Sequence, residues 1–125
     1  MNHRGTELTE AIIGAAIEVH RHPGPGLLES IYEAALAYEL TGLGLTVERQ
    51  KPIPLVHQSL KFEESFRIDL LVADEIVVEL RCVEAILPIH EAQVISYLKL
   101  TGLKTGLRLN FKSRVLKEGI RRYVS

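Results

Sequence analysis

The sequence predicts an α/β fold of the α+β type, in which a mixed, mostly antiparallel sheet is flanked by helices in the order ααβββαβ. Two observations indicate this class. Apolar residues recur at helical spacing in three segments, and alternating or β-branched runs lie between them. The 125 residues, 46% of them hydrophobic, suffice to bury one core but leave no room for a separate substrate domain. We therefore expect one domain over residues 1–125.

Two helices are expected first. The segment 7–21 is helical because one stripe of it is apolar, made of Leu8, Ile12, Ala15, Ala16 and Val19. Two prolines and two glycines in "HPGPG", residues 22–26, end that helix. A second helix follows over residues 27–41, before the glycines of "TGLG". Its expected apolar stripe is Leu27, Leu28, Ile31, Ala34, Ala35 and Tyr38.

Three strands come next. Residues 45–50 alternate as a strand does, and Pro52 and Pro54 restrict the following part to a sheet edge or an irregular extended segment. The two strongest strand predictions are "FRIDLLV" (66–72) and "EIVVELRCV" (75–83), which a short hairpin joins across Ala73 and Asp74.

The chain then returns to helix and ends in a strand. Residues 87–102 form a helix that begins near Pro88 and stops at Gly102, with an expected apolar face of Ile89, Ala92, Ile95 and Leu98 or Leu100. "KTGLRLNF", residues 104–111, is the last predicted strand, and the short basic tail after it is expected to form a helical turn.

Charge is distributed unevenly along the chain. The net charge is −1, yet residues 104–125 carry seven basic residues against one acidic residue, so this end could meet phosphate or simply form a solvated face. No signal peptide or membrane span is visible, and we expect a cytoplasmic protein without a membrane partner. The single cysteine, Cys82, is expected to be a small buried hydrophobic residue.

The predicted hairpin carries four charges among apolar residues. If its loop centres on Asp74, Asp69 lies opposite Glu79, and Arg67 lies opposite Arg81. A divalent cation such as Mg²⁺ or Mn²⁺ between the two carboxylates would neutralise them. Diagonal ion pairs, Asp69 with Arg81 and Glu79 with Arg67, would do so without a metal. Geometry alone leaves both arrangements open.

Polar residues also share one side of each of two helices, opposite the expected apolar stripes. They are Glu29, Tyr32 and Glu33 on the second helix and His90, Gln93 and Tyr97 on the third. Each set is by itself typical of a solvated face, and it becomes part of a site only if the helices flank the hairpin.

At this point the sequence resembles a known family. "GLLESIY" contains Gly26, Glu29 and Tyr32 at the spacing of the GxxExxY motif, which names a group of small proteins of the PD-(D/E)XK nuclease superfamily. The similarity extends through "IDLLV", "VVEL", "HEAQVISYLKLTGL" and "LNF", and so covers nearly the whole chain. It implies a restriction-endonuclease-like core.

The resemblance also implies a site. The acidic pair of the signature falls on Asp69 and Glu79 as ligands of Mg²⁺ or Mn²⁺, with Glu29 as a further acidic residue and Gln93 as the helix residue that follows the signature. In such nucleases the metal lowers the pKa of the attacking water, and a lysine assists that water. The implied function is metal-dependent cleavage of nucleic-acid phosphodiesters, with DNA favoured over RNA.

One residue departs from that signature, because Arg81 stands where the lysine is expected. Arginine stays protonated and cannot accept a proton from water, although its planar fork can clamp a phosphate. The metal, the phosphate or His90 would then have to assist the water. The alternative is a catalytically inactive module with the nuclease fold that binds nucleic acid or a protein partner. A homodimer formed at the proline-containing strand edge is a further option.

Overall fold

The computed structural model describes the backbone of residues 3–125 and the side chains of residues 6–61 and 66–125. Its elements are α1 (His3–Arg21), α2 (Glu29–Gly42), β1 (Val47–His57), β2 (Leu60–Val72), β3 (Ile76–Arg81), α3 (Pro88–Thr101), β4 (Thr105–Asn110), the 3₁₀ turn η1 (Leu116–Gly119) and β5 (Ile120–Val124). The predicted α+β class, with its mixed sheet flanked by helices, is confirmed.

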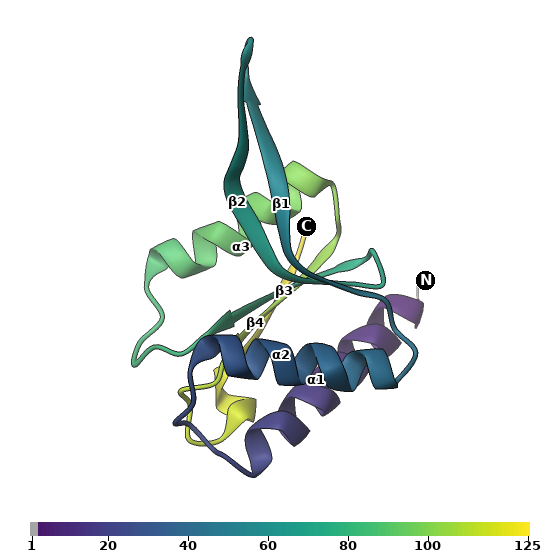
Figure 1. The fold of residues 1–125 in the computed structure, drawn as a ribbon, viewed down its shortest axis with the longest axis vertical. Helices are drawn as coiled ribbons and strands as arrows, with labels where there is room; N and C mark the ends of the chain where they lie inside the picture. The colour runs from purple at the N-terminus through teal and green to yellow at the C-terminus, as the bar shows by residue number, and fades with distance from the viewer. Residues whose placement is uncertain (1–2) are drawn as a thin grey trace.

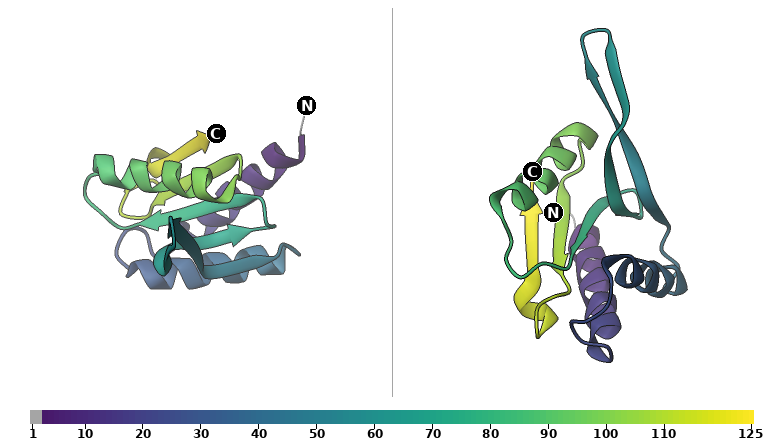
Figure 2. Two further views of the ribbon diagram at one scale, coloured as in Figure 1. Left: turned by 90° about the horizontal axis from the view of Figure 1, so that it is seen from above. Right: turned by 60° about the vertical axis from the view of Figure 1, so that its left-hand side comes forward.

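The five strands form one sheet in the order β1-β2-β3-β4-β5. Strands β3 and β4 are parallel, and every other neighbouring pair is antiparallel. Helix α3 lies on one face of the sheet, and α2 lies on the other with α1 beside it (Figures 1 and 2). Helix α3 also makes the connection between β3 and β4, because parallel neighbours need a long crossover.

Strand β3 separates two apolar clusters. Ile76, Val78 and Leu80 pack with α1 and α2, whereas Val77 packs with α3. Since side chains alternate along a strand, Glu79 and Arg81 continue on the α3 side after Val77. The last two positions of this buried side are therefore charged, and they define where the candidate site lies.

The predicted face of α1 is confirmed, because Leu8, Ile12 and Ala16 are buried in the larger cluster. The predicted face of α2 is wrong: Leu28 is 71% exposed and Tyr38 is 77% exposed. The side of α2 that contacts the sheet consists of Tyr32, Glu33, Leu36, Ala37 and Leu40. This helix is apolar on both sides, and packing selected the side whose polar residues also reach the sheet.

The predicted face of α3 is also largely wrong. Ile89, Ile95 and Leu100 are exposed, and the buried residues are Val94, Tyr97 and Leu98. Close packing against β4 explains this orientation, because a methyl group at Gly106 would lie 2.8 Å from Val94 Cγ1. The backbone of β4 thus approaches the Val94 side of α3.

Strands β1 and β2 form a long antiparallel arm that projects beyond the rest of the molecule (Figures 1 and 2). The sequence predicted strand only from residue 66, but β2 begins at Leu60 and β1 continues through Pro52 and Pro54. Strand β1 is an edge strand, and its register shifts between Ile53 and Leu55, as expected for a proline-containing strand.

The C-terminal segment was only partly predicted. The helical turn exists as η1, but the last residues form β5, which pairs with β4. The sequence of β5 does not alternate between apolar and polar residues, because the adjacent Arg121 and Arg122 are both exposed. Its pairing therefore depends on backbone hydrogen bonds to β4. Within the part of the chain that the structure describes, no helix is long and apolar enough to cross a membrane.

Candidate active site

The site lies where β2 separates from β3. The turn at Ala73 and Asp74 has left-handed backbone at both residues, with φ of 54° and 55°. The strands pair as predicted from Val72↔Ile76 to Leu70↔Val78, and regular pairing then ends. The hairpin centre on Asp74 is confirmed, and the next opposed positions in this register are those of Asp69 and Glu79.

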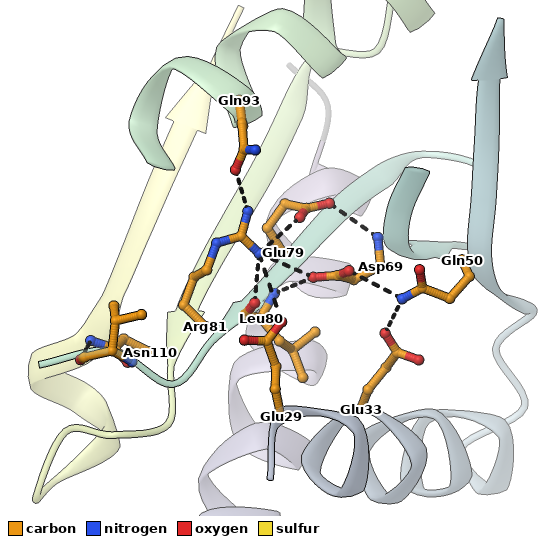
Figure 3. A network of polar contacts seen from close by, with 10 residues as sticks. Glu29, Glu33, Gln50, Asp69, Glu79, Leu80, Arg81, Gln93 and Asn110 are labelled. Carbon is orange, nitrogen blue, oxygen red and sulfur yellow. Dashed lines mark hydrogen bonds and ion pairs between the residues drawn. The ribbon is translucent and has the colours of Figure 1, made fainter. Parts of the chain in front are cut away.

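Where β2 and β3 separate, two carboxylates take the place of the backbone carbonyl groups that would accept hydrogen bonds in a regular sheet. The Asp69 amide donates to Glu79 Oε1 at 3.1 Å, and the Leu80 amide donates to Asp69 Oδ2 at 2.9 Å (Figure 3). Each carboxylate thereby accepts a hydrogen bond from a backbone N–H group that no longer has a partner in the neighbouring strand. This arrangement fixes the two acidic side chains against the backbone.

Arg81 lies between these carboxylates. Its Nη1 is 3.4 Å from Asp69 Oδ2 and 3.3 Å from Glu79 Oε2, and it donates to the Leu80 carbonyl oxygen at 2.7 Å. Its Nη2 donates to Gln93 Oε1 of α3. One guanidinium therefore contacts both predicted metal ligands and the predicted helix residue (Figure 3).

The predicted diagonal ion pairs are realised only in part. Asp69 pairs with Arg81 as that alternative required, but the cation that contacts Glu79 is again Arg81. Arg67 lies opposite Pro52 on the arm, and its side chain is exposed. The divergence of β2 from β3 carries Arg67 away from the hairpin face.

Burial dominates the electrostatics of Glu79, which is 1% exposed. Desolvation raises the pKa of its carboxyl to about 9, and the neighbouring Asp69 charge acts in the same direction. Glu29 is half-buried, and burial followed by the charge of Asp69 raises the pKa of its carboxyl, although Arg81 opposes that shift. The site therefore carries more acidic groups than its one guanidinium can neutralise.

Helix α2 delivers Glu29 to the edge of this group, with its Oε1 4.0 Å from Arg81 Nη1. The helix start is held by Tyr32, whose hydroxyl accepts from the amides of Gly26 at 3.0 Å and Leu27 at 3.1 Å and donates to the Gly24 carbonyl. Tyr32 is buried in the core rather than on a solvated face. The spacing of Gly26, Glu29 and Tyr32 thus has a structural reason: the tyrosine fixes the loop that precedes the glutamate.

Sequence reasoning missed Gln50. Its Nε2 donates to Glu33 Oε1 at 2.5 Å and to Asp69 Oδ1 at 3.2 Å, and so connects α2 to the site. Arg49 binds the other oxygen of Glu33, Oε2, through Nε at 3.2 Å and Nη2 at 3.0 Å. Gln50 has φ of 50° within a strand, a conformation that L-residues rarely adopt. No feature of "VERQ" indicates a left-handed backbone at Gln50, so no signal in the sequence could have placed Gln50 in the site.

The strained backbone at Gln50 leads to a testable prediction. Gln50→Ala loses the amide and keeps the left-handed strain, whereas Gln50→Gly loses the same amide without that strain. We expect the glycine variant to be more stable than the alanine variant by about 1 kcal/mol. Urea unfolding of both variants measures the difference, and an alanine variant equal to the glycine variant would contradict the prediction.

His90 caps a helix and does not join the acidic group, whereas Tyr97 is buried beside that group. Burial, followed by the charge of Glu79, raises the pKa of the Tyr97 hydroxyl. His90 Nδ1 accepts from the Leu87 amide at 2.9 Å, which caps the start of α3. Tyr97 is buried in the smaller cluster, with its ring edge-on to Phe66 at 6.1 Å between centroids. The task of His90 in this structure is therefore helix capping, and the structure gives no support to His90 as an assisting base.

The basic residues of the C-terminal segment begin beside the site. Arg108 of β4 is the partner of Glu79 in the parallel register, and its own antiparallel partner is Arg121 of β5. Arg108 is buried, and its Nη1 lies 3.3 Å from Glu91 Oε1 and donates to the Tyr123 hydroxyl at 2.7 Å. A row of positive charge thus starts one strand away from the acidic pair.

The donor set suits a hard divalent cation. Three oxygen atoms, Asp69 Oδ2, Glu79 Oε2 and the Leu80 carbonyl oxygen, surround the position of Arg81 Nη1, and we call them the oxygen cluster. Mg²⁺ and Mn²⁺ prefer such carboxylate and carbonyl ligands. Among the described residues, no group of three or more His, Cys, Asp or Glu side chains could hold a metal. A cation would therefore depend on two carboxylates and a backbone oxygen.

Comparison with known proteins agrees with this geometry. Residues 6–123 match the family model described as the PD-(D/E)XK nuclease superfamily. No curated protein and no solved structure matches the chain significantly. The match covers nearly all of the chain, including both carboxylates and Arg81. The protein therefore belongs to the PD-(D/E)XK nuclease superfamily, which indicates a nuclease-like function.

Proposed function

We propose that this protein cleaves nucleic-acid phosphodiesters with the help of Mg²⁺ or Mn²⁺, within one domain that spans residues 1–125. The observation that carries the proposal is the convergence of the oxygen cluster, to which Asp69 and Glu79 contribute from two different strands. These two residues would hold the cation. A cation bound there would supply a water of lowered pKa and neutralise charge on the phosphate.

The other residues of the site would position the substrate. Arg81 can bind a phosphate through its planar fork, and Gln93 orients that fork through Nη2. Glu29, the most exposed carboxylate of the group, lies at its outer side, where it can orient water. Because Arg81 cannot accept a proton, we expect slow cleavage.

The basic row supports nucleic acid as the substrate class. Arg108 is one strand away from Glu79, and Arg121 follows on β5. The Tyr123 ring lies 5.9 Å from the guanidinium carbon of each arginine. Arg108 is buried, but the exposed Arg121 can contact the phosphates that flank the cleaved bond. Duplex DNA is the first substrate to test.

A nuclease assay tests the proposal. We expect wild-type protein to cleave DNA slowly in Mn²⁺, Asp69→Ala to show no cleavage, and Arg81→Lys to cleave about a hundredfold faster or more, because a lysine can assist the attacking water. RNA and single-stranded DNA are assayed in parallel. The Asp69→Ala protein, purified identically, controls for a contaminating nuclease.

The contacts of Arg81 favour one second candidate. Arg81 pairs with both Asp69 and Glu79 without a metal, as a binding module with the nuclease fold would require. If neither wild type nor Arg81→Lys cleaves any substrate, while DNA binding persists in EDTA and weakens with salt, this second function is correct and the first is not.

A further inference from the structure

The position of Arg81 Nη1 has the properties of a cation-binding site that is already filled. The three atoms of the oxygen cluster lie at 2.7 to 3.4 Å from this nitrogen, and Glu29 Oε1 lies at 4.0 Å. The atoms come from β2, β3 and α2, so they converge from different elements. The guanidinium supplies one positive charge to a group of three carboxyl side chains, those of Glu29, Asp69 and Glu79 (Figure 3).

A divalent cation and Arg81 Nη1 cannot both occupy this position. Mg²⁺ needs its oxygen ligands at about 2.0–2.1 Å, so it would have to sit within the same small space. Two positive centres so close together in a partly buried site repel each other strongly. The Arg81 side chain is 14% exposed, and therefore little water is present to screen that repulsion.

We propose that Arg81 is a tethered cation that fills the metal position of the resting protein, and that a substrate phosphate admits the divalent ion by drawing Arg81 out of it. The substrate part of this inference rests on the proposed function, since it requires nucleic acid at this site. A guanidinium matches a phosphate with two parallel hydrogen bonds, which replace those that it loses to the carboxylates.

The consequence is coupled binding. If a phosphate removes Arg81 from the oxygen cluster, nucleic acid raises the affinity for the metal, and the metal must raise the affinity for nucleic acid by the same factor. Gln93 controls the exchange, because its Oε1 holds the Nη2 of Arg81 in the resting arrangement. Arg81 would thus limit metal binding in the absence of substrate.

Calorimetric titration with Mn²⁺ alone, at one fixed pH, tests the competition. We expect weak binding to metal-free wild type, binding tighter by about tenfold or more to Arg81→Met, and an intermediate affinity for Arg81→Lys. Arg21→Met is the matched control, because Arg21 is exposed at the end of α1, where it pairs with Glu18. Its affinity should equal that of wild type.

A second titration tests the role of substrate. Free Mn²⁺ is followed by electron paramagnetic resonance with and without a short DNA duplex, and Asp69→Ala with the same duplex corrects for Mn²⁺ bound by DNA. We expect DNA to raise the Mn²⁺ affinity of wild type about tenfold and to leave that of Arg81→Met unchanged. Circular dichroism verifies that each variant is folded, and Arg81→Lys replaces Arg81→Met if the latter is not.

The outcomes separate the two proposals. If wild type binds Mn²⁺ through Asp69 as tightly as Arg81→Met does, Arg81 does not compete and this inference is wrong, while the proposed metal site stands. If none of the proteins binds Mn²⁺, the proposed metal-dependent function fails together with the inference. If Arg81→Met binds tightly and DNA does not change the affinity of wild type, the coupling is refuted.

Discussion

Replacing Glu79 by glutamine is expected to raise the free energy of unfolding by up to about 4 kcal/mol near pH 7.5. Burial raises the pKa of the Glu79 carboxyl to about 9 in the folded protein, from an ordinary value of 4.5. Glutamine has nearly the same size and keeps an acceptor oxygen for the Asp69 amide, but it cannot ionise. The substitution therefore removes the cost of this buried acidic group.

The sign follows from proton binding. Above pH 4.5 the unfolded chain loses the Glu79 proton, whereas the folded protein keeps it until the pH approaches 9. The stabilising contribution of the protonated group is complete below pH 4.5, and it decreases by up to about 1.4 kcal/mol per pH unit as the pH rises to 9. We expect wild-type stability to fall over this range, and the contribution of Glu79 to that slope to vanish in Glu79→Gln.

Urea unfolding of both proteins at several pH values measures these slopes. Glu39→Gln, which changes an exposed glutamate of α2, is the matched control and should retain the slope of wild type. Equal slopes in wild type and Glu79→Gln would contradict the prediction. A carboxyl that destabilises the fold near neutral pH is retained at a cost, which is expected for a functional group and not for a structural one.

Removing the Tyr32 ring is the second large expected effect. Tyr32 is 1% exposed and stacks on Phe111 with ring centroids 4.5 Å apart. We expect Tyr32→Ala to lower the free energy of unfolding by about 3–5 kcal/mol, since a large buried ring is replaced by a cavity. Tyr38 lies on the same helix but is 77% exposed, so Tyr38→Ala should change the free energy of unfolding by less than about 0.5 kcal/mol.

Tyr32→Phe isolates the hydroxyl group. It keeps the ring but removes the acceptor for the Gly26 and Leu27 amides, for an expected loss of about 1–3 kcal/mol. Because these bonds hold the loop before Glu29, this variant should also loosen the start of α2, which amide hydrogen exchange would report. If Tyr32→Phe were as stable as wild type, with unchanged exchange in that loop, the hydroxyl would not anchor it.

The acidic pair was predictable because its geometry is local. Side chains alternate along strands, and a short turn at Asp74 sets the register of the hairpin, so opposed positions of Asp69 and Glu79 follow from spacing alone. The motif containing Gly26, Glu29 and Tyr32 was likewise visible as a pattern. Its physical reason, a tyrosine that binds the preceding loop, appears only when that loop folds back on the helix.

The faces of α2 and α3 were not predictable in this way. Both helices carry apolar residues on more than one side, and periodicity cannot choose between two apolar stripes. Contact with the sheet determined which side of each helix is buried, and these are the sides that bear Tyr32 and Tyr97. The same choice brought Glu29 and Gln93 towards β3, so an incorrect prediction of the faces concealed how the site is assembled.

Residue types at short spacings predicted the fold class and the acidic pair, and the resemblance to the nuclease family added that Arg81 stands at the position of a lysine. The contacts of Arg81 became visible only in the folded chain. Its guanidinium lies among oxygen atoms of β2, β3 and α2, and Gln93 of α3 binds its other end. Those partners are distant in sequence, and they meet because β2 separates from β3 between two helical layers.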